Sequence, residues 1–198
     1  MQTLVAVPVK RFFVAKQRLA PLLSATARSR LGRDLATHTL ETVQKAGFAP
    51  LVLAADARVA SWAARRGWEA EIDEGGGLDG AAATAATFAT AQEIPWIVLH
   101  ADLPLLTPGD VAVAAGYLAR GGSAIAPTDD GGTSLVGGRG EMRFSYGPGS
   151  FHRHLSRLDT PTVVVRRGLI LDLDDPGDFA AAVAHPRGSW LAPYAALP

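Results

Sequence analysis

Three aspartates are the residues whose types and spacing most directly indicate chemistry. Asp102 lies in IVLHADLP (97–104), whose apolar start indicates a buried strand of a parallel sheet. Open α/β sheets bind ligands beyond the carboxyl ends of their strands, so Asp102 is expected at a binding edge. Asp172 and Asp174 alternate with leucines in LDLD, and on a strand both carboxylates would point to one face.

Asp172 and Asp174 would be an unfavourable pair without a cation between them, because like charges held together raise each other's pKa. Edge-strand solubility and a local hydrogen-bonding role are the alternatives. The chain has no cysteine, and carboxylate oxygens select magnesium or manganese rather than zinc or copper. Because magnesium held in this way leaves positions for phosphates, Asp102 together with this pair indicates phosphoryl or nucleotidyl transfer.

A basic loop follows the first expected strand, Thr3–Val9. Two of the chain's three lysines, Lys10 and Lys16, lie there with Arg11 and Arg18. In a chain of zero net charge, such a concentration at the end of a strand suits a ligand that carries phosphates. The alternative is an ordinary solvated loop.

A second segment suited to a nucleotide is DEGGGLDGAAATA (73–85). Gly75, Gly76 and Gly77 would let the backbone approach a flat or phosphorylated ligand, and the helix that follows would offer free N–H groups. The spacing matches neither the Rossmann fingerprint nor a Walker A loop. A flexible turn is the alternative, in which Asp79 simply caps the helix.

Two stretches offer donors to a second anion. The glycines and aspartates of TDDGGTSLVG (128–137) argue against regular structure, and its Thr133 and Ser134 could donate hydroxyl groups, as they also could in a plain hairpin turn. In FSYGPGSFHRH (144–154) a glycine turn precedes Ser150, which could cap a helix whose N-terminus binds an anion. Further candidates, each equally explained by simple exposure or a structural role, are Arg153, His152, His154 and His100.

The rest of the chain alternates strands and helices, which indicates a parallel sheet covered by helices. One helix is expected from its cap Ser24 to a stop at Gly47, a second begins at Thr107–Pro108, and a third begins at 175–178. We therefore expect a single α/β domain over residues 1–198, with a mostly parallel twisted sheet flanked by helices. The other expected elements are strands at 51–55, 68–72, 123–127 and 162–166 and a helix at 57–66.

Composition supports a compact domain, since 48% of the 198 residues are hydrophobic and 19% are charged. The net charge of zero gives no support to nucleic-acid or membrane-surface binding. The first residues do not resemble a signal peptide, and no window is long enough to span a membrane, so a cytoplasmic location is expected. The apolar C-terminal stretch around Trp190, Leu191 and Tyr194 could pack on its own domain or on a partner.

Together these stretches resemble the 2-phospholactate guanylyltransferases of coenzyme F420 biosynthesis, including bacterial members that act on phosphoenolpyruvate. The resemblance runs almost end to end, and the order and spacing of the segments carry it. It implies a fold of the nucleotide-diphospho-sugar transferase (GT-A-like) type and the use of GTP. The segments are VPVKRFFVAKQRL, GGGLDGAAATA, HADLPLL, GGTSL, FSYGPGSFHRHL and DLDDPGDF.

The resemblance also implies roles for single residues. The family's metal-binding aspartates match Asp102, Asp172 and Asp174. Its phospho-acid contacts match Thr133, Gly147 and Ser150. By position, the GTP phosphates would be held by Lys10, Lys16 and Arg18, and guanine or ribose would face Gly77 to Asp79.

The implied reaction transfers GMP from GTP to a three-carbon phospho-acid and releases diphosphate. The acid's phosphate is already ionised near neutral pH, so no strong base is required, and two magnesium ions would neutralise the crowded charge. Phosphoenolpyruvate is the expected acid, with 2-phospho-L-lactate and 3-phospho-D-glycerate as alternatives, and the product could pass to the next transferase of the pathway. Two other classes are possible: a sugar-phosphate or molybdopterin-type nucleotidyltransferase, whose L-x-G-G-like first loop is absent, and a non-catalytic nucleotide-binding module.

Overall fold

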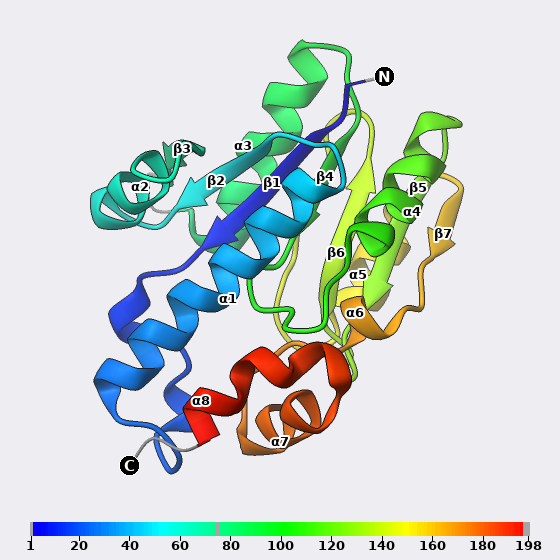
Figure 1. Cartoon of the computed structure of the whole chain (residues 1–198). Helices are drawn as coiled ribbons and strands as arrows, with labels where there is room; N and C mark the ends of the chain where they lie inside the picture. The colour runs from blue at the N-terminus through cyan, green and yellow to red at the C-terminus, as the bar shows by residue number, and fades with distance from the viewer. Residues whose placement is uncertain (1, 74–75, 196–198) are drawn as a thin grey trace.

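The computed structural model describes residues 2–73 and 76–195, which form a seven-stranded sheet flanked by helices (Figure 1). Gly75 lies outside the described residues. Across the sheet the strands follow the order β3-β2-β1-β4-β6-β5-β7. Their bounds are β1 Leu4–Val9, β2 Pro50–Ala54, β3 Glu69–Ile72, β4 Trp96–Leu99, β5 Ser123–Pro127, β6 Thr133–Gly138 and β7 Pro161–Val163.

Helices cover both faces of this sheet and the edge below the carboxyl end of β1 (Figure 1). The α-helices are α1 Ala25–Lys45, α2 Ala57–Ala64, α3 Gly77–Ala91, α4 Pro108–Ala119, α5 Ser150–Leu155, α6 Arg167–Ile170, α7 Pro176–Ala184 and α8 Ala192–Ala195. Three 3₁₀ helices complete the described elements, η1 Phe12–Val14, η2 Gln17–Leu19 and η3 Pro186–Leu191.

The apolar runs of the strands are explained by this two-sided burial. Val5 and Val7 of β1 join the core cluster that contains Leu40 of α1, whereas Ala6 joins a separate cluster with Ala81 of α3. Strands covered on both faces require apolar residues at successive positions. The mostly parallel α/β sheet expected from the sequence is therefore confirmed.

The predicted helix starts are confirmed by their caps. Ser24 accepts a hydrogen bond from the Ala27 amide at the start of α1. Thr107 and Asp110 form a capping box around Pro108 at α4, and 175–178 form another at α7. These signals are local, so they could be read from short stretches of sequence.

Strand β6 corrects the expectation that residues 128–137 are irregular. It runs antiparallel between β4 and β5, and all its residues are buried. The aspartates and the first glycines belong to the turn before it, in which Asp130 accepts a hydrogen bond from the Gly132 amide at 2.9 Å. The later glycines, Gly137 and Gly138, are buried residues of the strand, and at Gly137 neighbouring groups leave no room for a larger side chain.

Replacing Gly137 with alanine should destabilise the fold by about 1–3 kcal/mol, the usual cost of overpacking a filled core. The added Cβ would lie 3.0 Å from both Cγ1 of Ile97 and the carbonyl oxygen of Trp96. Gly138→Ala is the matched control, since its Cβ would meet nothing closer than 3.5 Å. Urea unfolding of the two variants measures the difference, and equal losses would contradict the steric explanation.

The Asp-x-Asp stretch does not form the expected strand. It follows α6 outside the sheet and is joined to the loop after β4 by a hydrogen bond from the Leu173 amide to the Asp102 carbonyl, at 3.0 Å. The alternation itself is present, because Leu171 and Leu173 are buried while Asp172 and Asp174 remain partly exposed. Packing of the two leucines, rather than a β-ladder, therefore turns both carboxylates outward.

Several boundaries also differ from the predicted ones. Ser150 is the first residue of α5 rather than its cap, which is Gly149, and this helix ends at Leu155. β7 is confined to Pro161–Val163, and α2 stops at Ala64. Short edge elements of this kind are set by tertiary contacts more than by local sequence.

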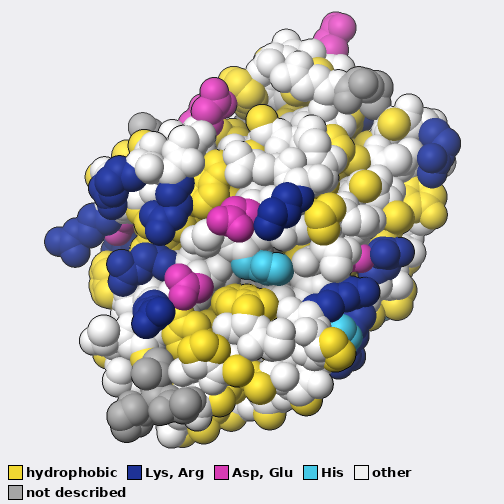
Figure 2. Space-filling view, viewed as in Figure 1, with side chains coloured by type: hydrophobic (Ala, Val, Ile, Leu, Met, Phe, Trp, Pro, Cys, Tyr) yellow, Lys and Arg dark blue, Asp and Glu magenta, His cyan; other side chains and the backbone are white. Residues whose placement is uncertain are grey.

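The surface and the C-terminal stretch agree with a compact domain. Figure 2 shows acidic side chains scattered among basic ones, with the basic ones gathered over α2 and the adjoining part of α1.

The C-terminal stretch packs on its own domain, because Leu191 and Tyr194 are buried in the same core cluster as Leu31 of α1. Across the described ranges no helix is long and apolar enough to cross a membrane.

Candidate active site

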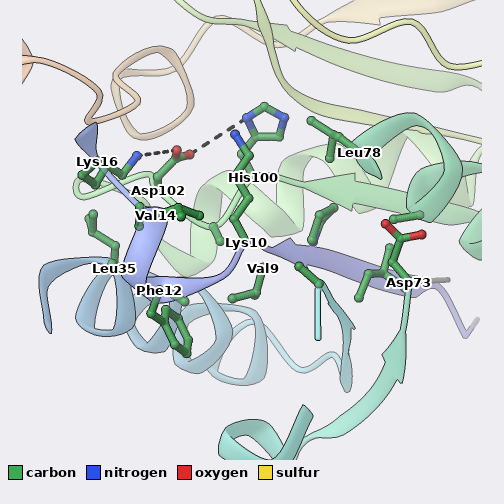
Figure 3. A pocket seen from close by; sticks show the side chains of 18 of the residues that line it. Val9, Lys10, Phe12, Val14, Lys16, Leu35, Asp73, Leu78, His100 and Asp102 are labelled. Carbon is green, nitrogen blue, oxygen red and sulfur yellow. Dashed lines mark hydrogen bonds and ion pairs between the residues drawn. The ribbon is translucent and has the colours of Figure 1, made fainter. Parts of the chain in front are cut away.

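Lys16 joins two of the predicted metal ligands. Its Nζ lies 2.6 Å from Oδ2 of Asp102, as Figure 3 shows, and 2.9 Å from Oδ1 of Asp174. Only 8% of the lysine side chain is exposed, against 24% for Asp102 and 47% for Asp174. The backbone of Lys16 is left-handed, with φ of 55°, a conformation that few residues other than glycine adopt. The loop after β1 is thus turned back onto the loop after β4.

These ion pairs fix the charge states of both partners. Burial alone would raise the pKa of Asp102, but the Lys16 ammonium and the neighbouring His100 hold it at about 2. Burial alone would lower the pKa of Lys16, but Asp102 and Asp174 raise it above its usual value. Lys16 and Asp102 are therefore both charged near neutral pH.

Asp172 is the carboxyl group of the cluster whose ionised form is most disfavoured. Burial raises its pKa to about 8, together with the charges of Asp102, Asp174 and Asp130. Asp130 is a member that the sequence did not reveal, because it lies in the turn before β6. The structure brings that turn to the cluster through a hydrogen bond from the Asp129 amide to the Ile170 carbonyl, at 3.3 Å.

The metal-free protein should lose stability between pH 7 and pH 8.5, as Asp172 ionises. Its pKa of about 8 exceeds the ordinary value of 3.8, so between these values the folded chain holds a proton that the unfolded chain has lost. The resulting stabilisation is complete below pH 3.8 and disappears as the pH rises through 8. Asp172→Asn should remove this slope and be the more stable protein at pH 8.5.

Urea unfolding at both pH values, in the presence of a chelator, measures the effect. His38, His100 and His154 do not contribute to it, because burial lowers the pKa of each below its ordinary value of 6.5 and so below this window. The same slope in the wild type and in Asp172→Asn would contradict the assignment.

The chemistry of this cluster fits a divalent cation. Asp102, Asp172 and Asp174 are hard oxygen donors, and Oδ1 of Asp102 is buried without a hydrogen-bond partner. Among residues 2–73 and 76–195, however, no three acidic or histidine side chains are grouped closely enough to hold a metal ion as they stand. Because Lys16 contacts two of the carboxylates, a cation could join them only if this ammonium moved. Metal binding therefore stays a prediction.

A cavity of about 310 Å³ adjoins the cluster, a volume suited to a small ligand. In Figure 3, Lys16 and Asp102 lie at one side of it and Asp73 and Leu78 at the other. Its walls also include Lys10 and Gly77, two of the predicted nucleotide contacts, and an apolar group formed by Val9, Phe12, Val14 and Leu35. One charged end and apolar walls suit a nucleotide, with its phosphates at the charged end.

Two other predicted nucleotide contacts, Arg18 and Asp79, do not line this cavity. Asp79 lies in the first turn of α3, where its Oδ1 accepts a hydrogen bond from the Tyr146 amide at 2.7 Å. Arg18 lies in η2. The pKa of Asp130 is lowered mainly by its hydrogen bond with Thr128, and the charge of Arg18 lowers it further.

The three predicted phospho-acid contacts are brought together, outside the lining of the cavity. Oγ1 of Thr133 lies 3.1 Å from Oγ of Ser150, and the Ser150 amide donates to the Gly147 carbonyl at 3.0 Å. Thr133 reaches the site because β6 is antiparallel to β4: the His100 amide donates to the Ser134 carbonyl at 2.8 Å. The start of β6 thus adjoins the end of β4.

The histidines divide into different environments. Nδ1 of His100 lies 3.9 Å from Oδ1 of Asp102, on the side that strand alternation predicted. His152 is exposed, whereas His154 is fully buried and bonds to Thr133. Arg153 donates to the backbone carbonyls of residues 145–148, so it holds this turn rather than presenting a free charge. Sequence reasoning missed the His154 contact with Thr133, because the two residues lie 21 positions apart and are brought together only by the assembled fold.

The fold is that of a nucleotide-diphospho-sugar transferase. A solved structure described in those words, from Desulfovibrio desulfuricans G20, matches with a TM-score of 0.74 over 98% of this chain and 95% of its own, at 16% identity. The family model described as "Guanylyl transferase CofC like" matches residues 3–189, and the chain belongs to this family. It is therefore an enzyme, a guanylyltransferase, and the family resemblance of the sequence is confirmed.

Two relatives illustrate the range of the family. A phosphoenolpyruvate guanylyltransferase from Sphaerobacter thermophilus is 30% identical over 93% of this chain and 94% of its own length. A 2-phospho-L-lactate guanylyltransferase from Methanothermobacter thermautotrophicus is 28% identical over 98% of this chain and 90% of its own length. Both relatives match nearly the whole chain.

Proposed function

We propose that this enzyme transfers GMP from GTP to phosphoenolpyruvate, with release of diphosphate, in coenzyme F420 biosynthesis. The observation that carries the proposal is the Lys16, Asp102 and Asp174 cluster beside a cavity of about 310 Å³ in a chain of the guanylyl transferase family. The name of the Sphaerobacter thermophilus relative favours phosphoenolpyruvate, and that of the Methanothermobacter thermautotrophicus relative makes 2-phospho-L-lactate the alternative. A cytoplasmic location and transfer of the product to the next pathway enzyme are part of the same proposal.

The two substrates would occupy adjoining parts of the site. Lys10 and Lys16 would bind the triphosphate at the charged end of the cavity, Arg18 would add a further phosphate contact from outside its lining, and Gly77 would face the nucleoside. Asp79 would act on the nucleotide only through the position of α3, because its Oδ1 already accepts a bond from the Tyr146 amide. The acceptor acid would bind near Thr133, Gly147 and Ser150.

The chain's residues would then position the substrates and neutralise their charge. Asp102, Asp172 and Asp174 would hold magnesium, which when bound supplies positive charge to the phosphates. Lys16 and Lys10 would stabilise the diphosphate as it leaves. The acceptor's phosphate oxygen would attack the α-phosphorus in line, and no side chain need remove a proton because that phosphate is already ionised.

A diphosphate-release assay tests the choice of acceptor. The protein is given GTP and magnesium with phosphoenolpyruvate, 2-phospho-L-lactate or 3-phospho-D-glycerate in turn, and ATP replaces GTP in a parallel series. Phosphoenolpyruvate with GTP should give the highest kcat/KM. A clear preference for another acid would overturn the assigned acceptor, and a preference for ATP would overturn the assigned nucleotide.

A further inference from the structure

Beside the cavity, a buried hydrogen-bonded network links α5 to the start of β6. Its side chains belong to His154, Thr133 and Ser150, which are 0%, 1% and 1% exposed. The Ser145 amide donates to Nε2 of His154 at 2.9 Å. Nδ1 of His154 lies 3.0 Å from Oγ1 of Thr133, which lies 3.1 Å from Oγ of Ser150.

The direction of this network follows from its first member. A backbone N–H can only donate, so Nε2 of His154 must accept and the neutral ring carries its proton on Nδ1. Burial supports the neutral form, since it lowers the pKa of His154 to about 4. Nδ1–H therefore donates to Oγ1 of Thr133.

The network leaves one hydroxyl proton unused. Its donors are the Ser145 amide, the His154 ring N–H and the hydroxyls of Thr133 and Ser150, and one bond joins each successive pair of groups. These four donor hydrogens make only three hydrogen bonds. Because the two N–H hydrogens are both used, the hydrogen left without a bond belongs to one of the two hydroxyl groups. Because the ring N–H occupies the side of Thr133 that faces His154, the remaining proton must point away from the ring. A phosphate oxygen, which only accepts, is suited to such a donor.

Ring contacts connect this network to the cluster of carboxylates. The His154 ring packs edge-on against the Tyr146 ring, with 4.7 Å between their centroids. The centroids of the Tyr146 and His100 rings are 5.3 Å apart. His100 in turn lies 3.9 Å from Asp102. The His154 ring is thus linked to Asp102 through two intervening rings, those of Tyr146 and His100.

We propose that His154 is a positioning residue for the acceptor substrate, and that it acts by orienting the hydroxyl groups of Thr133 and Ser150 toward the acceptor's phosphate. The inference rests on the proposed function, because it assigns these hydroxyls to the phospho-acid. His154 itself does not touch the substrate. A purely structural histidine would instead satisfy the Ser145 amide and have no selective effect on the acceptor.

Two substitutions of similar size separate these roles. His154→Gln places an acceptor near Nε2 but loses the donor at Nδ1, whereas His154→Asn keeps a donor near Nδ1 and loses the acceptor. His154→Gln should raise the KM for phosphoenolpyruvate about 3- to 10-fold, the equivalent of one hydrogen bond, while the KM for GTP stays unchanged. His154→Asn should keep the KM for phosphoenolpyruvate closer to that of the wild type, although its side chain no longer accepts the hydrogen bond from the Ser145 amide.

A double-substitution cycle with Thr133→Val tests the route of the effect. If His154 acts through the threonine hydroxyl, His154→Gln should add little to the loss caused by Thr133→Val. Additive losses, equal effects of Gln and Asn, or parallel changes in both KM values would overturn the inference. A wild type without guanylyl transfer would instead refute the proposed function.

A nuclear magnetic resonance measurement tests the network without turnover. Two-bond ¹H–¹⁵N spectra at neutral pH should show His154 as the Nδ1–H form, and phosphoenolpyruvate should shift that Nδ1–H resonance. The Nε2–H form, or a resonance indifferent to saturating acceptor in an active protein, would contradict the proposal.

Discussion

Replacing Asp174 with alanine should lower kcat/KM for guanylyl transfer by on the order of 10²–10³-fold, the effect typical of losing one group that stabilises transition-state charge. Asp174 is proposed to hold magnesium with Asp102 and Asp172. Nearly half of its side chain, 47%, is exposed, and its Oδ1 contacts the Lys16 ammonium, so the fold should survive the change. The loss should therefore appear in activity and not in unfolding.

Steady-state kinetics and thermal unfolding of Asp174→Ala measure the two quantities side by side. Asp129→Ala is the matched control, because this exposed acid lies on the neighbouring turn and has no assigned role in the site. The control should keep its activity. Near-wild-type transfer by Asp174→Ala would show that the metal assignment is wrong.

Replacing Lys16 with glutamine should change two affinities in opposite directions. Binding of GTP should weaken, because the proposed contact of Lys16 with the triphosphate is lost. Binding of a metal ion without nucleotide should strengthen about tenfold or more, since the ion no longer has to break charge-assisted hydrogen bonds worth roughly 1.5–3 kcal/mol each. This second effect follows from the contacts of Nζ with Asp102 and Asp174, at 2.6 and 2.9 Å.

Electron paramagnetic resonance titration with Mn²⁺ measures the free ion directly and needs no turnover. Lys45→Gln, a change at an exposed lysine near the end of α1, controls for the loss of one positive charge. The melting temperature of Lys16→Gln should also rise more on adding Mn²⁺ than that of the wild type, because its carboxylates lack a counter-charge. Unchanged or weaker metal binding would contradict competition between the ammonium and the ion.

Local features of the sequence predicted most of the fold. The caps at Ser24, Thr107 and 175–178 involve neighbouring residues, so short stretches contain the whole signal. Asp102 could be placed at the end of a parallel strand for the same reason, because β4 is an uninterrupted apolar run. The alternating leucines around Asp172 correctly predicted which side chains are buried, although not the type of backbone structure.

Long-range contacts account for what the sequence did not predict. The segment 133–138 forms a strand because it pairs with β4 on one side and with β5 on the other. Asp130 joins the acidic cluster through a contact between distant loops, and Lys16 reaches Asp102 and Asp174 only because the loop after β1 folds back. Hydrophobic periodicity and secondary-structure propensity contain no information about such long-range contacts, since each contact depends on the assembled sheet.

Transfer of label from α-³²P-labelled GTP tests the central proposal most directly. With magnesium and phosphoenolpyruvate present, the label should move into a new product that contains the acid, with one diphosphate released for each labelled product formed. No labelled product should form without the acid. Diphosphate release without an acid-containing labelled product, or no transfer with any of the three acids, would contradict the proposed reaction.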